Sequence, residues 1–379
     1  MDIAFIDPLV TLPINSGHDW YAFSLLDELA ANNDVTHYFT QEASGKRGYR
    51  PARVRFKTSA LESTGTWGAV SKHFTLLELL RPEILWDKSP VRDIKADVVF
   101  TNAETFHIGR VVAHQNKAPL VLIMHDIMWQ KWKSNGSPLF VPIRLVEKHA
   151  LRKASAIIAI SPKERTYATQ YASEDRIFYI PPKIDSNVFN NNDSNHHDYG
   201  TDKLNVLFYG ALDRIQNINA ARYLVKELIP ALSQRGVLSK IRVNVAGSGR
   251  PPSWLDSGDT KDLCFLGEVD DIASYVRGAD VVVVPITNPC GMKIRILESL
   301  ACGTPVVATP EAVAGLPAQL KHAVHVATEE EGFEEILGRF VSGDLPLSVS
   351  VEATTQSTES ACTQDVLNYV SNHCDTASA

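Results

Sequence analysis

The chain has 379 residues, which is enough for two ordinary domains with hydrophobic cores of their own. Its composition, with 44% hydrophobic and 21% charged residues, is that of a globular protein. No apolar run approaches the roughly 18 residues that a membrane-spanning helix needs. The formal net charge of −7 and the lack of a nucleic-acid-binding motif argue against nucleic acid as a partner.

The charge is unevenly distributed along the chain. Residues 1–180 carry 22 Lys and Arg against 19 Asp and Glu, whereas the remaining residues carry 15 against 25. One interpretation of the basic excess is a solvated loop and edge strand, and the other is a surface for an anionic acceptor or for the inner face of a membrane. The excess includes Lys46, Arg47, Arg50, Arg53, Arg55 and Lys57.

The cysteines form no disulfide or metal-binding pattern. An odd number of scattered cysteines indicates free thiols in a reducing compartment. Met1 leads directly into a strand pattern and not into a signal peptide. We therefore expect a cytoplasmic protein without a metal site, and we expect His196 and His197 to be solvated. The cysteines are Cys264, Cys290, Cys302, Cys362 and Cys374.

Strand and helix patterns alternate in the first half of the chain, which predicts an α/β domain with a parallel sheet. The stretch 40–95 shows no clear period and receives no assignment. The expected strands cover residues 3–6, 98–101, 120–124 and 156–160, and the expected helices cover residues 20–31 and 143–153.

The domain boundary is predicted in a polar stretch at residues 182–203, whose composition is typical of a linker or surface loop. It separates a first domain, 1–181, from a second domain, 204–345. A C-terminal tail, 346–379, has some helical character near 365–370 and is expected to pack back on the protein.

The second half repeats the alternation. Asn217 is a plausible N-cap for a helix that continues to about residue 232. Further strands are expected at 204–209, 241–246, 264–267, 281–284 and 305–308, and helices at 271–278 and 292–302.

The unit from residue 281 to residue 308 is a strand, a loop, a helix and a second strand. Lys293 and Arg295 lie at the start of its helix, and Glu298 lies one turn further in. A helix N-terminus with two cations favours a phosphorylated ligand, and an acid nearby favours a ribose. The alternative is that these are exposed helix residues, with Arg295 paired to Glu298 at i, i+3.

Glu298 followed by Ser-Leu-Ala-Cys-Gly-Thr-Pro-Val-Val resembles the donor-binding signature of glycosyltransferase family 4. The segment 180–189 also resembles the family's domain junction. The resemblance implies the GT-B fold: two Rossmann-like parallel-sheet domains that face a cleft. It departs from the family at Cys290, where many relatives have a second glutamate. It also departs in the loop after Gly210, where Ala211 replaces the expected arginine, the expected lysine is missing, and Arg214 is the only cation.

The resemblance also implies roles for individual residues. Lys293 and Arg295 would neutralise the diphosphate, and His125 would contact the donor sugar; these three are the expected catalytic residues. On the acceptor side we expect Asp126, Glu104 and His107. The expected donor-binding residues are Gly17, Gly210, Arg214, Gly247, Val269, Cys290, Gly291, Met292 and Glu298.

The implied activity is a retaining, metal-independent transfer of a sugar from a nucleoside-diphosphate sugar to a glycan, lipid-linked or small-molecule acceptor. No cofactor is implied besides this donor substrate. Two alternatives stay open: a sugar-nucleotide epimerase of the same fold, and a catalytically silent subunit that binds a partner or glycan. A nicotinamide enzyme is disfavoured, because the third glycine of the dinucleotide fingerprint is missing after Gly249.

Overall fold

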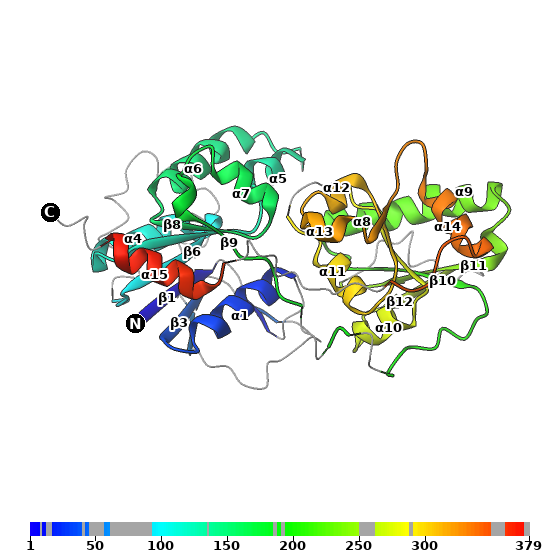
Figure 1. The fold of residues 1–379 in the computed structure, drawn as a ribbon, viewed down its shortest axis with the longest axis horizontal. Coiled ribbons are helices and arrows are strands. Elements are labelled where there is room, and N and C mark those ends of the chain that lie inside the picture. Colours follow the sequence, from blue (N-terminus) through cyan, green and yellow to red (C-terminus); the bar gives the residue numbers. More distant parts are fainter. Residues whose placement is uncertain are drawn as a thin grey trace. The chain divides into compact units, whose positions relative to one another are not determined.

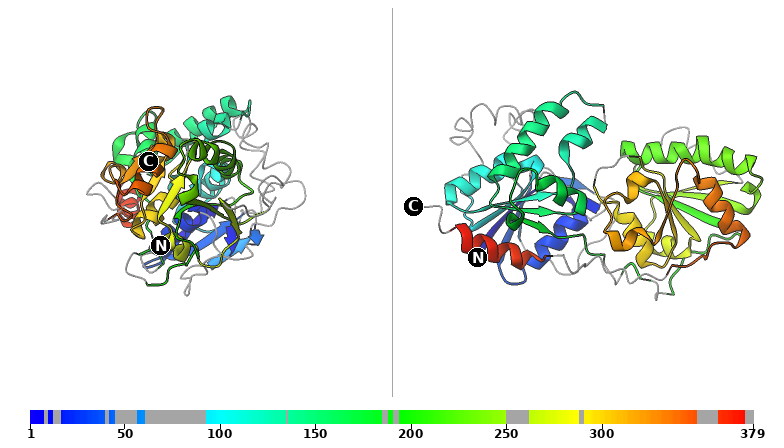
Figure 2. Two further views of the ribbon diagram at one scale, coloured as in Figure 1. Left: turned by 90° about the vertical axis from the view of Figure 1, so that its right-hand side faces the viewer. Right: turned by 45° about the horizontal axis from the view of Figure 1, so that its top comes forward.

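The computed structural model describes residues 1–7, 10–12, 17–39, 42–44, 57–60, 93–134, 136–184, 188–190, 194–249, 262–287, 291–349 and 361–374. The chain divides into two compact units (Figure 1). Unit 1 contains residues 1–182 and 356–379, and unit 2 contains residues 183–355. Each unit is built around one parallel sheet, with helices on both faces (Figure 2).

Unit 1 contains a sheet of seven parallel strands in the order β5-β3-β1-β6-β7-β8-β9. The order reverses between β1 and β6, so this is the switch point at which open α/β sheets bind ligands. The strands are β1 (Asp2–Asp7), β3 (Asp34–Phe39), β5 (Lys57–Ala60), β6 (Val98–Asn102), β7 (Leu120–Met124), β8 (Ala156–Ala159) and β9 (Ile177–Tyr179); β2 (Val10–Leu12) and β4 (Glu42–Ser44) pair separately.

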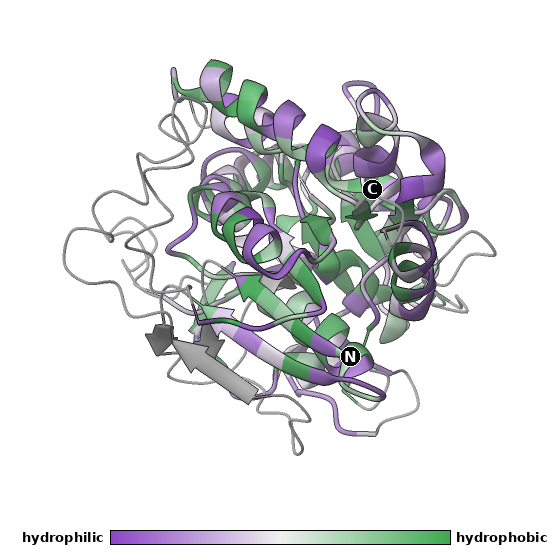
Figure 3. Cartoon of the chain, turned by 90° about the vertical axis from the view of Figure 1, so that its left-hand side faces the viewer, coloured by the Kyte–Doolittle hydropathy of each residue, from purple (hydrophilic) through white to green (hydrophobic). Residues whose placement is uncertain are grey.

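The central strands of unit 1 are hydrophobic (Figure 3), as expected for a sheet covered on both faces. Phe5 and Phe100 belong to the core on one face, and Leu122 and Leu151 belong to the core on the other. No described helix is long and apolar enough to cross a membrane. The helices are α1 (Gly17–Leu29), α4 (Phe106–Asn116), α5 (Met128–Ser134), α6 (Phe140–Lys153), α7 (Pro162–Ala168) and α15 (Thr363–Cys374).

The C-terminal helix α15 completes unit 1. It packs beside α1 (Figure 1), and Val366 and Leu367 are buried in the core that α1 covers. Both the backbone N–H and the hydroxyl of Thr363 donate hydrogen bonds of 2.9 Å to Oε1 of Glu28. The helix thereby covers apolar surface that α1 alone would leave exposed.

Unit 2 contains a sheet of six parallel strands in the order β12-β11-β10-β13-β14-β15. Its order reverses between β10 and β13. The strands are β10 (Leu204–Tyr209), β11 (Ile241–Ala246), β12 (Leu263–Gly267), β13 (Val281–Val284), β14 (Val306–Ala308) and β15 (Val324–Val326), and the helices are α8 (Ile215–Tyr223), α9 (Ile229–Gln234), α10 (Ile272–Gly278), α11 (Ile294–Ala301), α12 (Pro310–Val313), α13 (Ala318–Lys321) and α14 (Phe333–Ser342).

The expected strands of both halves are present, and the α/β fold class is confirmed. The N-cap assignment of Asn217 is wrong. Arg214 is the N-cap of α8, and Asn217 lies inside the first turn with its side chain donating to the carbonyl of Ala211. The helix of residues 215–234 also contains a π-helical segment at Leu224–Leu228, next to Pro230, which has no N–H to donate.

The polar stretch before β10 is attached to α10. His197 stacks on Tyr275 with ring centroids 3.8 Å apart, and its backbone N–H donates to the carbonyl of Ser274 at 2.9 Å. A Cβ atom on Gly278 would lie 2.2 Å from the carbonyl oxygen of His197, so the two backbones are in direct contact. The expectation of a solvated side chain is therefore wrong for His197, whereas His196 is exposed.

Two buried glutamates give unit 1 a pH-dependent stability. Burial raises the pKa of both Glu164 and Glu147 from 4.5 to about 7. Glu164 also accepts a hydrogen bond from the hydroxyl of Ser161. The folded state therefore holds protons that the unfolded state has lost, so these groups contribute stability at low pH that disappears as the pH rises from about 4.5 to about 7.

We expect Glu164→Gln to remove its part of this loss, on the order of 3 kcal/mol. Urea unfolding at about pH 5 and about pH 8 would measure it. The same substitution at the exposed Glu174 is the control and should leave the difference between the two pH values unchanged. An equal pH dependence in the Glu164→Gln variant and the parent protein would contradict the prediction.

Candidate functional site

Two loops of unit 2 meet at the switch point between β10 and β13. Gly210 directly follows β10, with φ of +157°, and α11 begins after the loop that follows β13. A Cβ atom on Gly210 would lie 2.7 Å from Nη2 of Arg295 and 2.8 Å from Nδ2 of Asn217. The missing side chain therefore allows the guanidinium of Arg295 to lie directly against the backbone of the first loop.

Arg295 brings a buried positive charge to this site. Its Nη2 donates to Oδ1 of Asn217 at 2.9 Å, and the guanidinium lies 5.3 Å from the ring centroid of Phe208. Nη1 is buried and has no hydrogen-bond partner among the described residues. Burial lowers the pKa of Arg295, yet a guanidinium remains charged at neutral pH. A buried charge with an unused donor favours an anionic ligand.

Glu298 lies one turn further along α11. Its Oε2 accepts a hydrogen bond of 2.8 Å from the hydroxyl of Tyr209, and burial raises its pKa. Both Arg295 and Glu298 are partly buried, so the alternative that they are exposed helix residues is wrong. Their hydrogen bonds run to Asn217 and Tyr209 on the neighbouring elements.

Lys293 is the N-cap of α11, which therefore begins two residues later than the pattern predicted. Its Nζ donates to the carbonyl of Gly291 at 3.4 Å. Gly291 has φ of +65°, which turns the chain into the helix, and Met292 is buried. Arg214, the exposed N-cap of α8, is close enough for its charge to contribute to lowering the pKa of Arg295.

The loops after β10 and β11 touch through two glycines. A Cβ atom on Gly247 would lie 2.0 Å from the carbonyl oxygen of Gly210, so no side chain fits there. Val269, after β12, packs against the core of unit 2. Cys290 lies outside the described residues.

Unit 1 has its own polar group at its switch point. His125 follows β7, and its Nε2 lies 2.8 Å from Oδ1 of Asn102, the last residue of β6. Nδ2 of Asn102 donates to Oδ1 of Asp7, the last residue of β1, at 2.9 Å. Gly17 begins α1 in the same unit.

The expected acceptor-side residues lie beside this group. Lys131 lies 3.0 Å from Asp126 and 3.8 Å from Glu104, so both carboxylates share one partly exposed ammonium group. Burial lowers the pKa of His107 to about 4, so this imidazole is neutral at physiological pH. A neutral histidine can both donate and accept a hydrogen bond.

Family models match both halves of the chain. The model described as "Glycosyltransferase Family 4" matches residues 15–188, and the model described as "Glycosyl transferases group 1" matches residues 203–341. The chain belongs to glycosyltransferase family 4. The two matches together cover most of the sequence, and the second includes the loops around Arg295 and Glu298.

Curated relatives of this family 4 chain are D-inositol 3-phosphate glycosyltransferases. The one from Pseudarthrobacter chlorophenolicus is 30% identical over 225 residues, which are 54% of this chain and 51% of the relative. The one from Thermobifida fusca is 29% identical over 237 residues, which are 57% and 54%. The chain spans about half the length of the curated relatives it matches.

Solved structures share the fold over almost the whole chain. Anabaena HepE in complex with UDP-glucose has a TM-score of 0.62 at 15% identity, covering 98% of this chain and 99% of the other. Sucrose-phosphate synthase from Thermosynechococcus elongatus has a TM-score of 0.62 at 18% identity, covering 98% and 94%. At these identities the likeness shows the fold alone, which is the GT-B fold.

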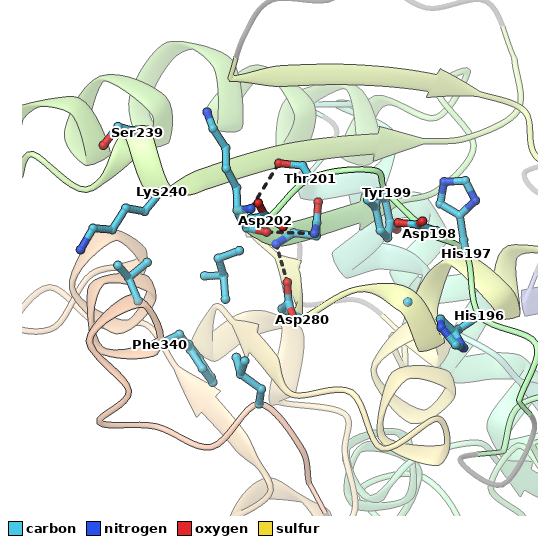
Figure 4. Close-up of a pocket in the computed structure, with 16 residues that line it drawn as sticks. His196, His197, Asp198, Tyr199, Thr201, Asp202, Ser239, Lys240, Asp280 and Phe340 are labelled. Carbon is cyan, nitrogen blue, oxygen red and sulfur yellow. Dashed lines mark hydrogen bonds between the residues drawn. The ribbon is translucent and has the colours of Figure 1, made fainter.

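An open pocket of about 710 Å³ in unit 2 is not lined by Arg295 or Glu298. It lies at the amino ends of the strands, because Leu204, Lys240 and Asp280 all stand at or just before the starts of β10, β11 and β13. Figure 4 shows Lys240 and Phe340 on one side of it and the two histidines on the other. Ligands of α/β sheets bind at the opposite, carboxyl edge.

Four residues that contact the predicted site residues or their partners were not predicted in these roles from the sequence. The Tyr209 hydroxyl donates to Glu298, Asn217 accepts from Arg295, and Asn102 bonds both His125 and Asp7. Three of them could have been found from their position in the sequence. Asp7, Asn102 and Tyr209 are the last residues of strands and so lie at the carboxyl edge of a sheet, where ligands bind. His125 was predicted for the same reason, because it follows a strand.

Proposed function

We propose that this chain transfers a sugar from a nucleoside-diphosphate sugar to a hydroxyl-bearing acceptor. The observation that carries the proposal is Nη1 of Arg295, which is buried without a partner in the described part of unit 2 and lies beside Gly210. A diphosphate oxygen would supply the missing acceptor and the missing negative charge. The curated relatives named as glycosyltransferases support the same activity.

The proposed chemistry is stabilisation of the leaving diphosphate. Arg295, Lys293 and the backbone N–H groups at the start of α11 would take up charge as the bond to the sugar breaks. Glu298, held by Tyr209, would accept hydrogen bonds from the ribose hydroxyls. We propose retention of the anomeric configuration without a metal ion, with His125 contacting the sugar and Asp126, Glu104 and His107 on the acceptor side.

The acceptor class follows from the relatives and stays part of the proposal. The names of the curated relatives contain D-inositol 3-phosphate, so phosphorylated cyclitols are the first acceptors to test. One of the structural neighbours is WaaG, described as a glycosyltransferase of lipopolysaccharide biosynthesis, so lipid-linked acceptors are the second.

The proposal is tested by thermal shift of the full chain with UDP, GDP, ADP, dTDP and CMP. A ligand at about 100 times its dissociation constant should stabilise the protein by about 2.7 kcal/mol. One diphosphate should raise the melting temperature, and its sugar nucleotides should then release that diphosphate when an acceptor is added. No shift with any nucleotide would contradict the proposal and favour a silent binding subunit.

We expect Glu298→Gln to weaken nucleoside-diphosphate binding while leaving binding of inorganic pyrophosphate unchanged. The loss should be about 10- to 100-fold, the value of a hydrogen bond to a charged group. Calorimetry with both ligands measures it. The control is Glu331→Gln, whose carboxylate pairs with Arg339 on the surface of the same unit. Equal losses for both ligands would contradict the ribose role.

We also propose that unit 1 associates with a membrane surface through α5 and α6. The segment 128–153 contains six Lys and Arg residues and a single acid, Glu147, which is buried. Three apolar side chains near the start of α6 are exposed: Leu139 by 46%, Val141 by 53% and Leu145 by 54%. Exposed apolar groups beside positive charge suit an anionic lipid surface.

We expect the full chain to sediment with phosphatidylglycerol vesicles and not with phosphatidylcholine vesicles. The double substitution Val141→Glu/Leu145→Glu should weaken binding at least about tenfold, because it removes apolar burial and adds negative charge. The matched control is Leu347→Glu, an exposed leucine of unit 2. Sedimentation that is unaffected by the double substitution would contradict the assignment to this surface.

A further inference from the structure

Asp7, Asn102 and His125 form a continuous hydrogen-bonded chain across three adjacent strands of unit 1. The distances are 2.9 Å from Nδ2 of Asn102 to Oδ1 of Asp7 and 2.8 Å from Oδ1 of Asn102 to Nε2 of His125. Asp7 is 1% exposed and Asn102 is 3% exposed. Buried side chains in such a chain have little freedom to exchange partners, because an unpaired polar group would be costly.

The direction of each hydrogen bond follows from the chemistry of the groups. A carboxylate can only accept, so the Asn102 side chain must turn its amide nitrogen toward Asp7. Its carbonyl oxygen then faces His125, and a carbonyl can also only accept. Nε2 of His125 must therefore carry a proton, and in the neutral ring Nδ1 carries none.

Two further contacts fix these groups in place. The ring of Tyr21 meets the ring of His125 edge-on at 5.3 Å, and the Tyr21 hydroxyl donates to the carbonyl of Ile180 at 2.7 Å. On the other side, Nε2 of His37 lies 3.8 Å from Oδ2 of Asp7, and both side chains are 1% exposed. The carboxylate of Asp7 is thus held between His37 and Asn102.

We infer that Asp7 and Asn102 are positioning residues that set the orientation and the proton of the His125 ring. This inference rests on the proposed function for its catalytic meaning, because His125 is the group proposed to contact the donor sugar. The Asp7 carboxylate orients the Asn102 amide, and the Asn102 carbonyl selects the tautomer with hydrogen on Nε2. His125 then presents Nδ1 as a hydrogen-bond acceptor for a sugar hydroxyl.

The tautomer can be measured without any substrate. In the full chain labelled with ¹⁵N-histidine, the His125 signals, assigned with His125→Ala, should show a protonated Nε2 and an unprotonated Nδ1. In Asp7→Asn the new amide can donate to Asn102 and reverse its orientation, so the other tautomer should appear in part or in full. Asp34→Asn, an exposed carboxylate at the far end of β3, is the control and should keep the parent tautomer.

Kinetics provide the second readout. Asp7→Asn and Asn102→Leu should each lower kcat about 10- to 100-fold, the range typical when the hydrogen-bond support of a metal-binding histidine is removed. Binding of nucleoside diphosphate, which involves unit 2, should not change. A variant that lowered kcat and the affinity for nucleoside diphosphate by the same factor would be acting through folding.

A protonated Nδ1 in the parent protein would overturn the inference, and so would an unchanged tautomer in a folded Asp7→Asn variant. If Asp7→Asn does not fold, the parent spectrum alone decides. If the parent protein binds no nucleotide, the proposed function fails, while the tautomer result still confirms or refutes the positioning of His125.

Discussion

Replacing Arg295 with Met should lower kcat/KM for the donor about 100- to 1,000-fold without lowering the melting temperature of the free protein. The loss of rate follows because the guanidinium is the buried cation against which charge on the leaving diphosphate would develop. The melting temperature should not fall, because the parent protein pays a desolvation cost for the guanidinium and its unpaired Nη1. An apolar side chain of similar length removes this cost.

The control is Arg339→Met, which removes a surface guanidinium paired with Glu331 at 2.7 Å. This substitution should leave kcat/KM unchanged and alter stability by less than about 1 kcal/mol. Steady-state kinetics and calorimetric melting of the same samples give both quantities. A large fall in melting temperature with unchanged kcat/KM in Arg295→Met would identify Arg295 as a structural residue.

Replacing Gly247 with Ala should destabilise unit 2 by about 3 kcal/mol, the upper part of the range for overpacking. The added Cβ would lie 2.0 Å from the carbonyl oxygen of Gly210, and backbone must move to relieve the contact. For a unit of this size the melting temperature should fall by about 6 to 12 °C. The displaced Gly210 loop should also weaken nucleotide binding, because it lies against Arg295.

The same substitution at Gly338 should have the opposite effect. Gly338 lies inside α14, and the nearest heavy atom to its added Cβ is Nε of Arg235 at 3.5 Å, an ordinary contact. Alanine in a helix interior is more favourable than glycine by about 1 kcal/mol. Destabilisation by both substitutions, or by neither, would contradict the account of the Gly210–Gly247 contact.

The parallel sheets were predictable from the sequence because their strands are short apolar runs buried on both faces. Val281–Val284 and Leu120–Met124 are completely buried, and each was recognised from its composition. The candidate residues on α11 were also predictable, because the helix start, the two cations and the acid lie within six residues of one another.

The partners of these residues were not predictable, because they come from distant parts of the chain. Asn217 lies 78 residues from Arg295, and Asp7 lies 95 residues from Asn102. Only the strand order brings them together, and local patterns do not specify it. Asn217 was misread as an N-cap because its residue type favours that role, whereas its side chain instead bridges Ala211 and Arg295.

The packing of the polar run before β10 was also not predictable from the sequence, for a different reason. Its composition is typical of a solvated linker, yet His197 stacks on Tyr275 and Tyr199 donates to the carbonyl of Tyr275 at 2.9 Å. Composition measures how much apolar surface a segment offers. It does not register that a glycine on a neighbouring helix, here Gly278, allows a polar backbone to pack closely.

The most direct test of the central claim is hydrogen–deuterium exchange of the full chain with and without the nucleoside diphosphate that binds it. Slower exchange is expected at residues 210–217 and 291–297, which surround Arg295 at the carboxyl edge of the unit 2 sheet. Protection confined to the pocket at the amino edge, around residues 196–205, 239–240 and 278–280, would contradict it.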